Sequence, residues 1–131
     1  MGSDNFNFSA WIGDRESAED DITIQAVVAM SATLDRDDPA PLIGDPLPTL
    51  WHWMYFSPKV RRSGLGTDGH AEREGFLPPV PLPRRMYAGA RYTFHTPIRI
   101  GTRVGRTSEL LDVTGSRRHL CRRRKLKWIS D

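Results

Sequence analysis

The chain has 131 residues, 38% hydrophobic and 27% charged, which is typical of a single globular domain. Its net charge of +3 is uneven: residues 1–115 hold 12 Lys/Arg and 15 Asp/Glu, whereas residues 116–131 hold 7 Lys/Arg and only Asp131. No apolar run is long enough for a membrane span, and the only cysteine, Cys121, excludes an internal disulfide, so we expect a cytoplasmic protein with no membrane partner.

The N-terminal third predicts one amphipathic helix. Residues 1–10 are expected to form a disordered N-terminus. Either Asp20–Asp21 or Thr23 is placed to cap a helix that begins near Ile24. The helix is predicted because apolar and small residues recur at helical spacing, at Ile24, Val27, Val28, Ser31 and Leu34. The segment Asp35–Pro39 ends it.

The segment Leu50–Phe56 is apolar or aromatic at nearly every position, which indicates burial on all sides. Periodicity does not separate a buried strand from a short buried helix here. Two interpretations of its ring-bearing side chains stay open: they form hydrophobic core, or some of them line a site for an acyl chain or a pantetheine arm. The candidate residues are Trp51, His52, Trp53, Tyr55 and Phe56.

A polar loop follows over residues 59–74, and its Gly64–Gly69 stretch satisfies the spacing G-x-G-x-x-G. A dinucleotide site needs a strand before that motif and a helix after it, and neither flank has apolar periodicity, so we interpret it as a flexible loop. Asp68 and His70 suggest an acid–base pair, but an exposed turn is the simpler interpretation. No His, Cys or acidic cluster has the spacing of metal ligands, so neither a metal nor a cofactor is expected.

The stretch from Gly75 to Ile100 contains the main predicted features of the second half of the chain. A proline-rich run, extended by necessity, leads into a clean alternation from Met86 to His95 that predicts a half-buried strand. Its small residues Ala88 and Ala90 are expected to face the core. Arg84 and Arg85 are candidates to bind CoA phosphates, with Arg91 and His95 as further candidates on the outer face.

The last predicted elements are a turn and a strand. Gly101–Thr102 has turn chemistry, and Arg103–Val113 is predicted to be a further sheet segment with a bulge at Leu110–Leu111.

Three segments carry a family resemblance: LWHWMYFSP, LGTDGH and GFLPPVPLPRRMYAGARYTFHTPIRIG. Together they closely resemble the N-terminal half of MaoC-like acyl-CoA hydratases, above all the mesaconyl-C4-CoA (3-methylfumaryl-CoA) hydratases with their FAS1-like dehydratase domain. The resemblance implies an α+β hotdog fold over residues 11–115, an antiparallel sheet around a central helix, with Leu50–Phe56 as that helix. Residues 116–131 form a basic tail that does not match the family, so we expect a hotdog incomplete at its C-terminus, as a truncated or frame-shifted gene would produce.

The resemblance also implies a function without catalysis. In these hydratases the acid–base pair lies in the C-terminal half, in an Asn-Gly-His-x-Ile-His-Tyr-Asp-like segment that this chain lacks, so no catalytic residue carries over. The expected role is acyl-CoA thioester binding, with a C-terminal catalytic hotdog half or a second copy as partner. Two alternatives stay open: an acyl-CoA-binding module with no enzyme activity, and anionic-polymer binding through the arginine-rich tail. Nucleic acid is not an expected partner, since that last reading depends on composition alone.

Overall fold

The computed structural model describes residues 7–71, 78, 86–115 and 120–130. Within these residues the chain forms a mixed α+β structure, as the resemblance implied. The elements are strands β1 (Arg15–Asp21), β2 (Arg103–Gly115) and β3 (Leu120–Ser130), helix α1 (Ile24–Thr33), and the 3₁₀ turns η1 (Ser9–Trp11), η2 (Trp51–Met54) and η3 (Arg62–Gly64).

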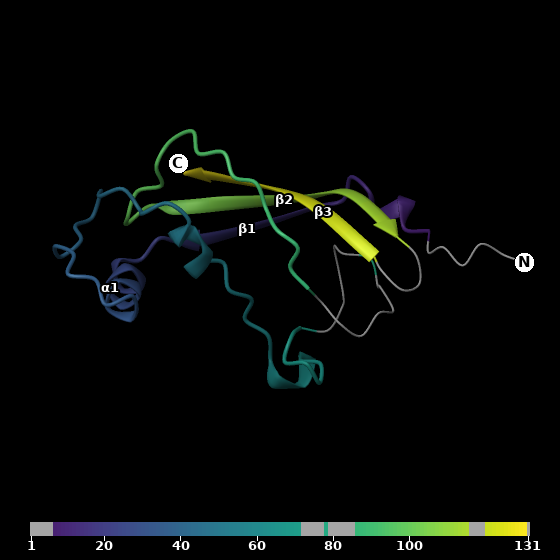
Figure 1. The fold of residues 1–131 in the computed structure, drawn as a ribbon, viewed down its shortest axis with the longest axis horizontal. Helices are drawn as coiled ribbons and strands as arrows, with labels where there is room; N and C mark the ends of the chain where they lie inside the picture. Colours follow the sequence, from purple (N-terminus) through teal and green to yellow (C-terminus); the bar gives the residue numbers. More distant parts are fainter. Residues whose placement is uncertain (1–6, 72–77, 79–85, 116–119, 131) are drawn as a thin grey trace, which may run out of the picture. The chain divides into compact units, whose positions relative to one another are not determined.

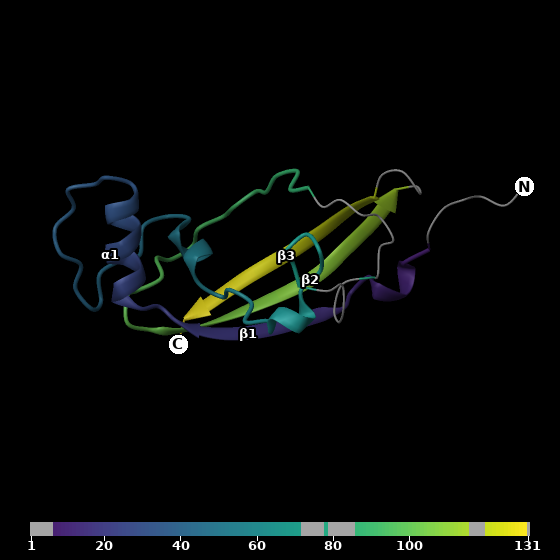
Figure 2. The ribbon, with the colours of Figure 1, turned by 90° about the horizontal axis from the view of Figure 1, so that it is seen from below.

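The strands form a sheet in the order β1-β2-β3, with β2 in the middle (Figure 1). Their arrows alternate in direction, so the sheet is antiparallel (Figure 2). Near one end of the β1–β2 pair, Leu110 N–H donates to Asp14 O at 3.0 Å. At the other end, Ile22 N–H donates to Thr102 O at 2.9 Å. The predicted sheet segment at Arg103–Val113 is confirmed by β2.

Strand β1 was not expected from the sequence, because RESAEDD has neither apolar alternation nor residues with high strand propensity. Its charged side chains instead meet partners on β2. Arg15 lies 3.5 Å from Glu109, while Arg103 reaches Glu19 at 3.0 Å and Asp21 at 3.1 Å. Exposed ion pairs of this kind contribute only about 0–1 kcal/mol each. Their main effect is therefore to favour this strand register.

The chain divides into two compact units. The first contains residues 1–17, 58–90 and 107–127, and the second contains residues 18–57, 91–106 and 128–131. Strand β2 buries Ser108 and Leu110 in the first unit and Val104 in the second, at alternate positions along the strand. These three side chains therefore lie on the same face of β2, and this face contributes buried side chains to both units.

The hydrophobic core of the second unit combines helix, loops and sheet. Its buried members are Ile22, Val27, Leu47, Tyr55, Ile100 and Val104. Helix α1 begins at Ile24, as predicted, and contributes Val27 to this core. Val28 and Leu34 were predicted on the same face but are 51% and 53% exposed. The helix therefore buries a narrower stripe than its sequence suggested.

A loop pairs with the residues that precede β2 and closes this core. Leu47 N–H donates to Ile98 O at 2.7 Å, and Ile100 N–H donates to Asp45 O at 2.9 Å. The predicted turn is present at Gly101, whose φ of +90° strongly favours glycine. A Cβ there would also lie 2.8 Å from Ile43 Cγ2. Glycine thus meets both a backbone and a space requirement where the chain enters β2.

The predicted strand from Met86 to His95 is not found. These residues form no strand, and Ala88 and Ala90, expected in the core, are exposed. An alternating segment becomes a strand only when a sheet edge supplies hydrogen-bond partners, and this segment pairs with none of the three strands β1, β2 and β3. Of the proline run before it, Pro78 is buried, and residues 79–85 lie outside the described part of the chain.

The arginine-rich end also differs from expectation. Residues 116–131 were predicted as a basic tail, but Leu120–Ser130 form β3 beside β2. Pairing uses backbone groups, and charged side chains are well tolerated on a strand at the edge of a sheet. The arginine clusters therefore did not prevent strand formation.

Candidate functional site

The aromatic segment Leu50–Phe56 forms a short turn rather than the predicted core helix. Only Trp51–Met54 are helical, in the 3₁₀ turn η2. Leu50, directly before this turn, and Phe56, two residues after it, have φ of +73° and +61°. Left-handed backbone is costly for bulky residues and cannot continue a right-handed helix. The turn therefore stays short and sends successive side chains in different directions.

Two candidate side chains of this segment are structural. Tyr55 is buried in the core of the second unit, and its hydroxyl donates to Thr23 O at 2.7 Å. Burial raises the pKa of this hydroxyl. Phe56 N–H donates to the Asp20 carboxylate at 2.8 Å, and the Arg106 guanidinium lies 5.2 Å from the Phe56 ring centroid. The core interpretation fits these two residues.

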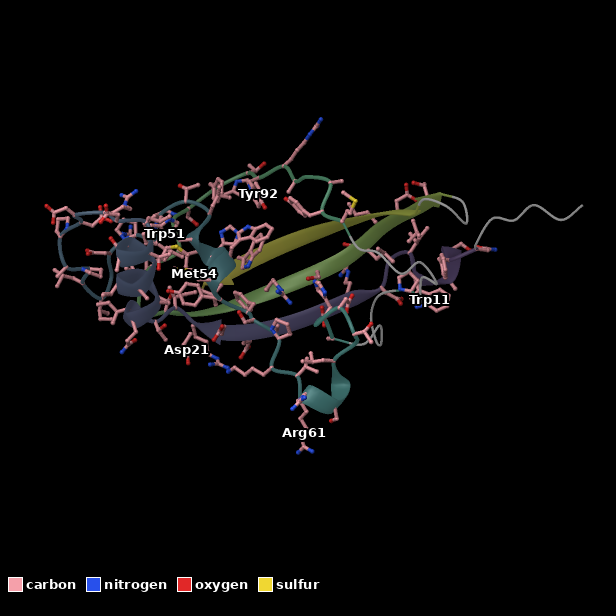
Figure 3. The ribbon with its side chains drawn as sticks, turned by 60° about the horizontal axis from the view of Figure 1, so that its bottom comes forward. Trp11, Asp21, Trp51, Met54, Arg61 and Tyr92 are labelled. Atoms are coloured by element: carbon pink, nitrogen blue, oxygen red, sulfur yellow. The ribbon has the colours of Figure 1, made fainter. Side chains whose placement is uncertain are left out.

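Trp51 packs against the same core and has a cation over its ring. The Arg36 guanidinium lies 5.7 Å from the Trp51 centroid. Arg36 is itself held by both oxygens of Asp38, at 2.7 and 3.0 Å, and Ser31 Oγ donates to the same carboxylate. Trp51 and Met54 are labelled in Figure 3, near α1. Trp51 therefore joins the helix end to the turn.

The remaining candidates of the segment meet three further rings, and we name these five residues the aromatic cluster: His52, Trp53, Tyr92, Phe94 and Trp128. The His52 centroid lies 4.4 Å from Trp128, 6.1 Å from Tyr92 and 6.4 Å from Phe94. Trp53 lies 6.3 Å from Tyr92, and Tyr92, which is labelled in Figure 3, stacks on Phe94 at 6.1 Å. All five residues belong to the second unit.

Two of these rings bury polar atoms. His52 is only 5% exposed, and its Nε2 has no hydrogen-bond partner among the described residues. The buried Nε1 of Trp128 likewise has none within the described part of the chain. Burial lowers the pKa of His52, so its imidazole is neutral at physiological pH. Trp53 and Phe94 are 56% and 53% exposed, so the aromatic cluster reaches the surface.

The sequence anticipated part of this cluster. His52 and Trp53 were candidate residues, whereas Tyr92 and Phe94 were not; the structure places both of these rings near the His52 ring. Trp128 was missed because it lies in a segment that reads as a basic tail. The only signal was a tryptophan next to Ile129 in an otherwise charged stretch.

The four cationic candidates are either exposed or outside the described residues. Arg91 and His95 are exposed. Arg84 and Arg85 lie outside the described residues, so their role in phosphate binding stays a prediction.

The glycine-rich loop is a compact turn in the first unit. Leu65 and Ala71 form an isolated antiparallel bridge, and Gly66 N–H donates to His70 O at 2.8 Å. His70 Nδ1 lies 3.5 Å from Asp68 Oδ2, with the imidazole 63% exposed. The 3₁₀ turn η3, and not a strand, leads into the loop, so the structural context that a dinucleotide motif needs on its N-terminal side is not found in the described residues.

The described residues provide neither a metal-binding cluster nor a membrane-spanning helix. They contain no group of three or more His, Cys, Asp or Glu side chains arranged to hold a metal ion. No helix among them has the length and apolar character to span a membrane.

Comparison with known proteins places the aromatic cluster in a family context. The sequence model of hydroxyacyl-thioester dehydratase type 2 matches residues 50–130, which include all five cluster residues. The mesaconyl-C(4)-CoA hydratase of Chloroflexus aurantiacus is 48% identical over 108 residues, which cover 82% of this chain and 39% of that protein. The chain thus spans well under half the length of this curated relative. The family match covers more than half of the chain, which therefore belongs to the hydroxyacyl-thioester dehydratase type 2 family of hotdog proteins.

Proposed function

We propose that this chain is the non-catalytic N-terminal hotdog half of a MaoC-type acyl-CoA hydratase or dehydratase, and that it contributes acyl-CoA thioester binding to a double-hotdog enzyme. The observation that carries this proposal is the aromatic cluster, which lies wholly within the residues matched to the family. Flat rings with a few polar atoms suit an unsaturated acyl chain and its thioester.

The non-catalytic role follows from what hydration requires. A base must activate water and an acid must protonate the α-carbon, both within hydrogen-bond reach of the substrate. His52 is a neutral imidazole packed among rings, and His70 with Asp68 lies on an exposed turn. The sequence also lacks the histidine-containing segment of the catalytic halves. We therefore assign acid–base chemistry to a catalytic hotdog half as partner, since a second copy of this chain would bring no acid–base pair either.

Binding of a CoA thioester also requires cations for its phosphates. Arg84 and Arg85 follow the proline run directly, and we propose that they provide these charges. Arg91 is exposed immediately before Tyr92 of the aromatic cluster and is a further candidate.

The test is tryptophan fluorescence of the full chain titrated with crotonyl-CoA. We expect saturable quenching that is reduced in Trp53→Phe, since Trp53 is the exposed tryptophan of the cluster. The double variant Arg84→Ala/Arg85→Ala should weaken the apparent affinity, because it removes the phosphate contacts. Trp11→Phe is the matched control, since Trp11 belongs to the other unit. Equal quenching by adenosine nucleotides, unchanged in the double variant, would exclude an acyl-binding role.

A further inference from the structure

The two edge strands of the sheet carry opposite charge. In the order β1-β2-β3, strand β2 has a neighbour on each side, whereas β1 and β3 pair with no strand other than β2 in the described part of the chain (Figure 1). The sequence of β1 contains four acidic residues and one arginine, a balance of −3. The sequence of β3 contains three arginines, two lysines and no acidic residue, a balance of +5. The sheet therefore has one acidic and one basic edge.

The ion pairs between β1 and β2 do not cancel the charge of the acidic edge. Arg103 of β2 lies 3.0 Å from Glu19 and 3.1 Å from Asp21, but both carboxylates stay mostly exposed. Strand β2 carries two arginines and two acidic residues, a balance of zero. The paired strands β1 and β2 together therefore keep the balance of −3 that β1 has alone.

The backbone of an edge strand can pair with another chain, and charge decides which chain. The outer N–H and C=O groups of an edge strand are a template for a strand of another molecule. Two copies of β3 side by side would bring cations against cations, and two copies of β1 would bring carboxylates against carboxylates, which destabilises the pair. Pairing of β1 with β3 instead places opposite charges across the contact.

We propose that copies of this chain associate by pairing the acidic edge strand β1 of one copy with the basic edge strand β3 of the next. The seven residues of β1 give a contact about 23 Å long. The contact joins two different surfaces, so every open assembly keeps one acidic and one basic edge, and association continues until a ring closes. It uses the backbone and charge of the edge strands and does not depend on the proposed acyl-CoA binding.

The experiment is sedimentation velocity of the full chain over a range of protein concentrations, in about 50 mM and about 500 mM NaCl. At low salt we expect the weight-average mass to rise with concentration beyond that of a dimer. At high salt the apparent association constant should fall at least about tenfold, because salt screens charges at the protein surface.

A first variant weakens the acidic edge and keeps the basic one. Glu16→Gln/Asp20→Asn removes two of the four acidic residues of β1 and leaves Glu19 and Asp21, which hold Arg103. The asparagine amide oxygen can still accept the Phe56 N–H, which Asp20 accepts at 2.8 Å. This variant should stay monomeric at the concentrations at which the wild type associates.

A second variant weakens the basic edge and keeps the acidic one. Arg122→Gln/Arg123→Gln/Arg124→Gln lowers the balance of β3 from +5 to +2 and should also stay monomeric alone. An equimolar mixture of the two variants should form a dimer with one copy of each and then stop, because only one intact acidic edge and one intact basic edge are present. Circular dichroism checks that both variants fold.

The matched control removes three cations from an exposed loop instead of a strand, with Lys59→Gln/Arg61→Gln/Arg62→Gln. It should associate as the wild type does, and loss of association in this control would assign the effect to net charge and overturn the inference.

Three results with the wild type would overturn it as well: a monomer at every concentration, a mass that does not respond to salt, or growth that stops at a dimer. Association that nuclease treatment removes would show that the basic strand binds nucleic acid instead. A mixture of the two folded variants that stays monomeric would equally refute the pairing. Because the mass of the wild type and its salt dependence decide the matter, a variant that fails to fold does not prevent the test.

Discussion

His52 is the central residue of the aromatic cluster. It is 5% exposed, contacts three other rings and keeps a polar nitrogen in a buried position. Burial disfavours the charged imidazolium, which lowers the pKa of His52 below the ordinary value of 6.5. In the unfolded chain the same imidazole keeps its ordinary pKa of 6.5. Between this pH and the lower pKa of the folded state, the unfolded state therefore binds more protons than the folded state.

This difference predicts a pH dependence of stability. Above the unfolded pKa the folded state carries no penalty from His52, and its free energy of unfolding should decrease as the pH falls from 7.5 through 6.5 towards the folded pKa. Urea unfolding of the wild type and of His52→Phe, at several pH values in this range, measures the effect. The variant should show a weaker decrease. Identical pH profiles would show that the imidazole is not buried in the folded protein.

At the scale of elements, the turn η2 is held by contacts at both ends rather than by its own length. Phe56 adopts left-handed backbone, yet its N–H is bound by Asp20 and its ring lies under Arg106. Strained backbone of this kind persists only where the surroundings determine it. The turn itself ends at Tyr55, whose backbone is extended, and Tyr55 and His52 point to different environments, one in the core and one in the aromatic cluster.

The exposure of Ala90 predicts that a larger side chain there has little effect on stability. The sequence placed this alanine in the core, where Ala90→Leu would overpack it and cost about 1–3 kcal/mol. In the structure Ala90 is exposed, so the substitution should change the free energy of unfolding by less than about 0.5 kcal/mol. Ile100→Ala, at a site 2% exposed, should cost about 2–5 kcal/mol and serves as the positive control. Chemical denaturation measures both, and a large cost at Ala90 would support the predicted strand.

At the scale of the whole molecule, the proposed assignment of binding to this chain and of catalysis to a second hotdog half can be tested. The purified chain should show no enoyl-CoA hydration above background, because the residues that the structure describes hold no positioned acid–base pair. Addition of a MaoC-type catalytic half in trans should raise the hydration rate above that of the catalytic half alone. The loss of the enoyl thioester absorbance measures both.

The control for this experiment is His70→Ala, which removes the imidazole of the exposed Asp68–His70 pair. It should leave the stimulation unchanged. Turnover by the chain alone, abolished in this variant, would instead make the glycine turn a catalytic element and refute the non-catalytic role.

The sequence by itself determined the features that depend on local pattern. Helical spacing predicted α1, sheet periodicity predicted β2, and glycine chemistry predicted the turn at Gly101. The aromatic run was interpreted as core or as a binding site, and in the structure its residues divide between the core and the aromatic cluster. The family was recognisable because three contiguous motifs of this sequence carry the resemblance.

Only the tertiary structure decided which segments pair and which distant rings meet. The clean alternation of Met86–His95 lacks a sheet partner, while the polar strand β1 and the arginine-rich strand β3 flank β2. Periodicity describes which side chains could share a face, but pairing depends on backbone partners far away in sequence. The sequence identified His52 as a candidate but not Trp128, because the two residues that make this contact lie far apart in the chain.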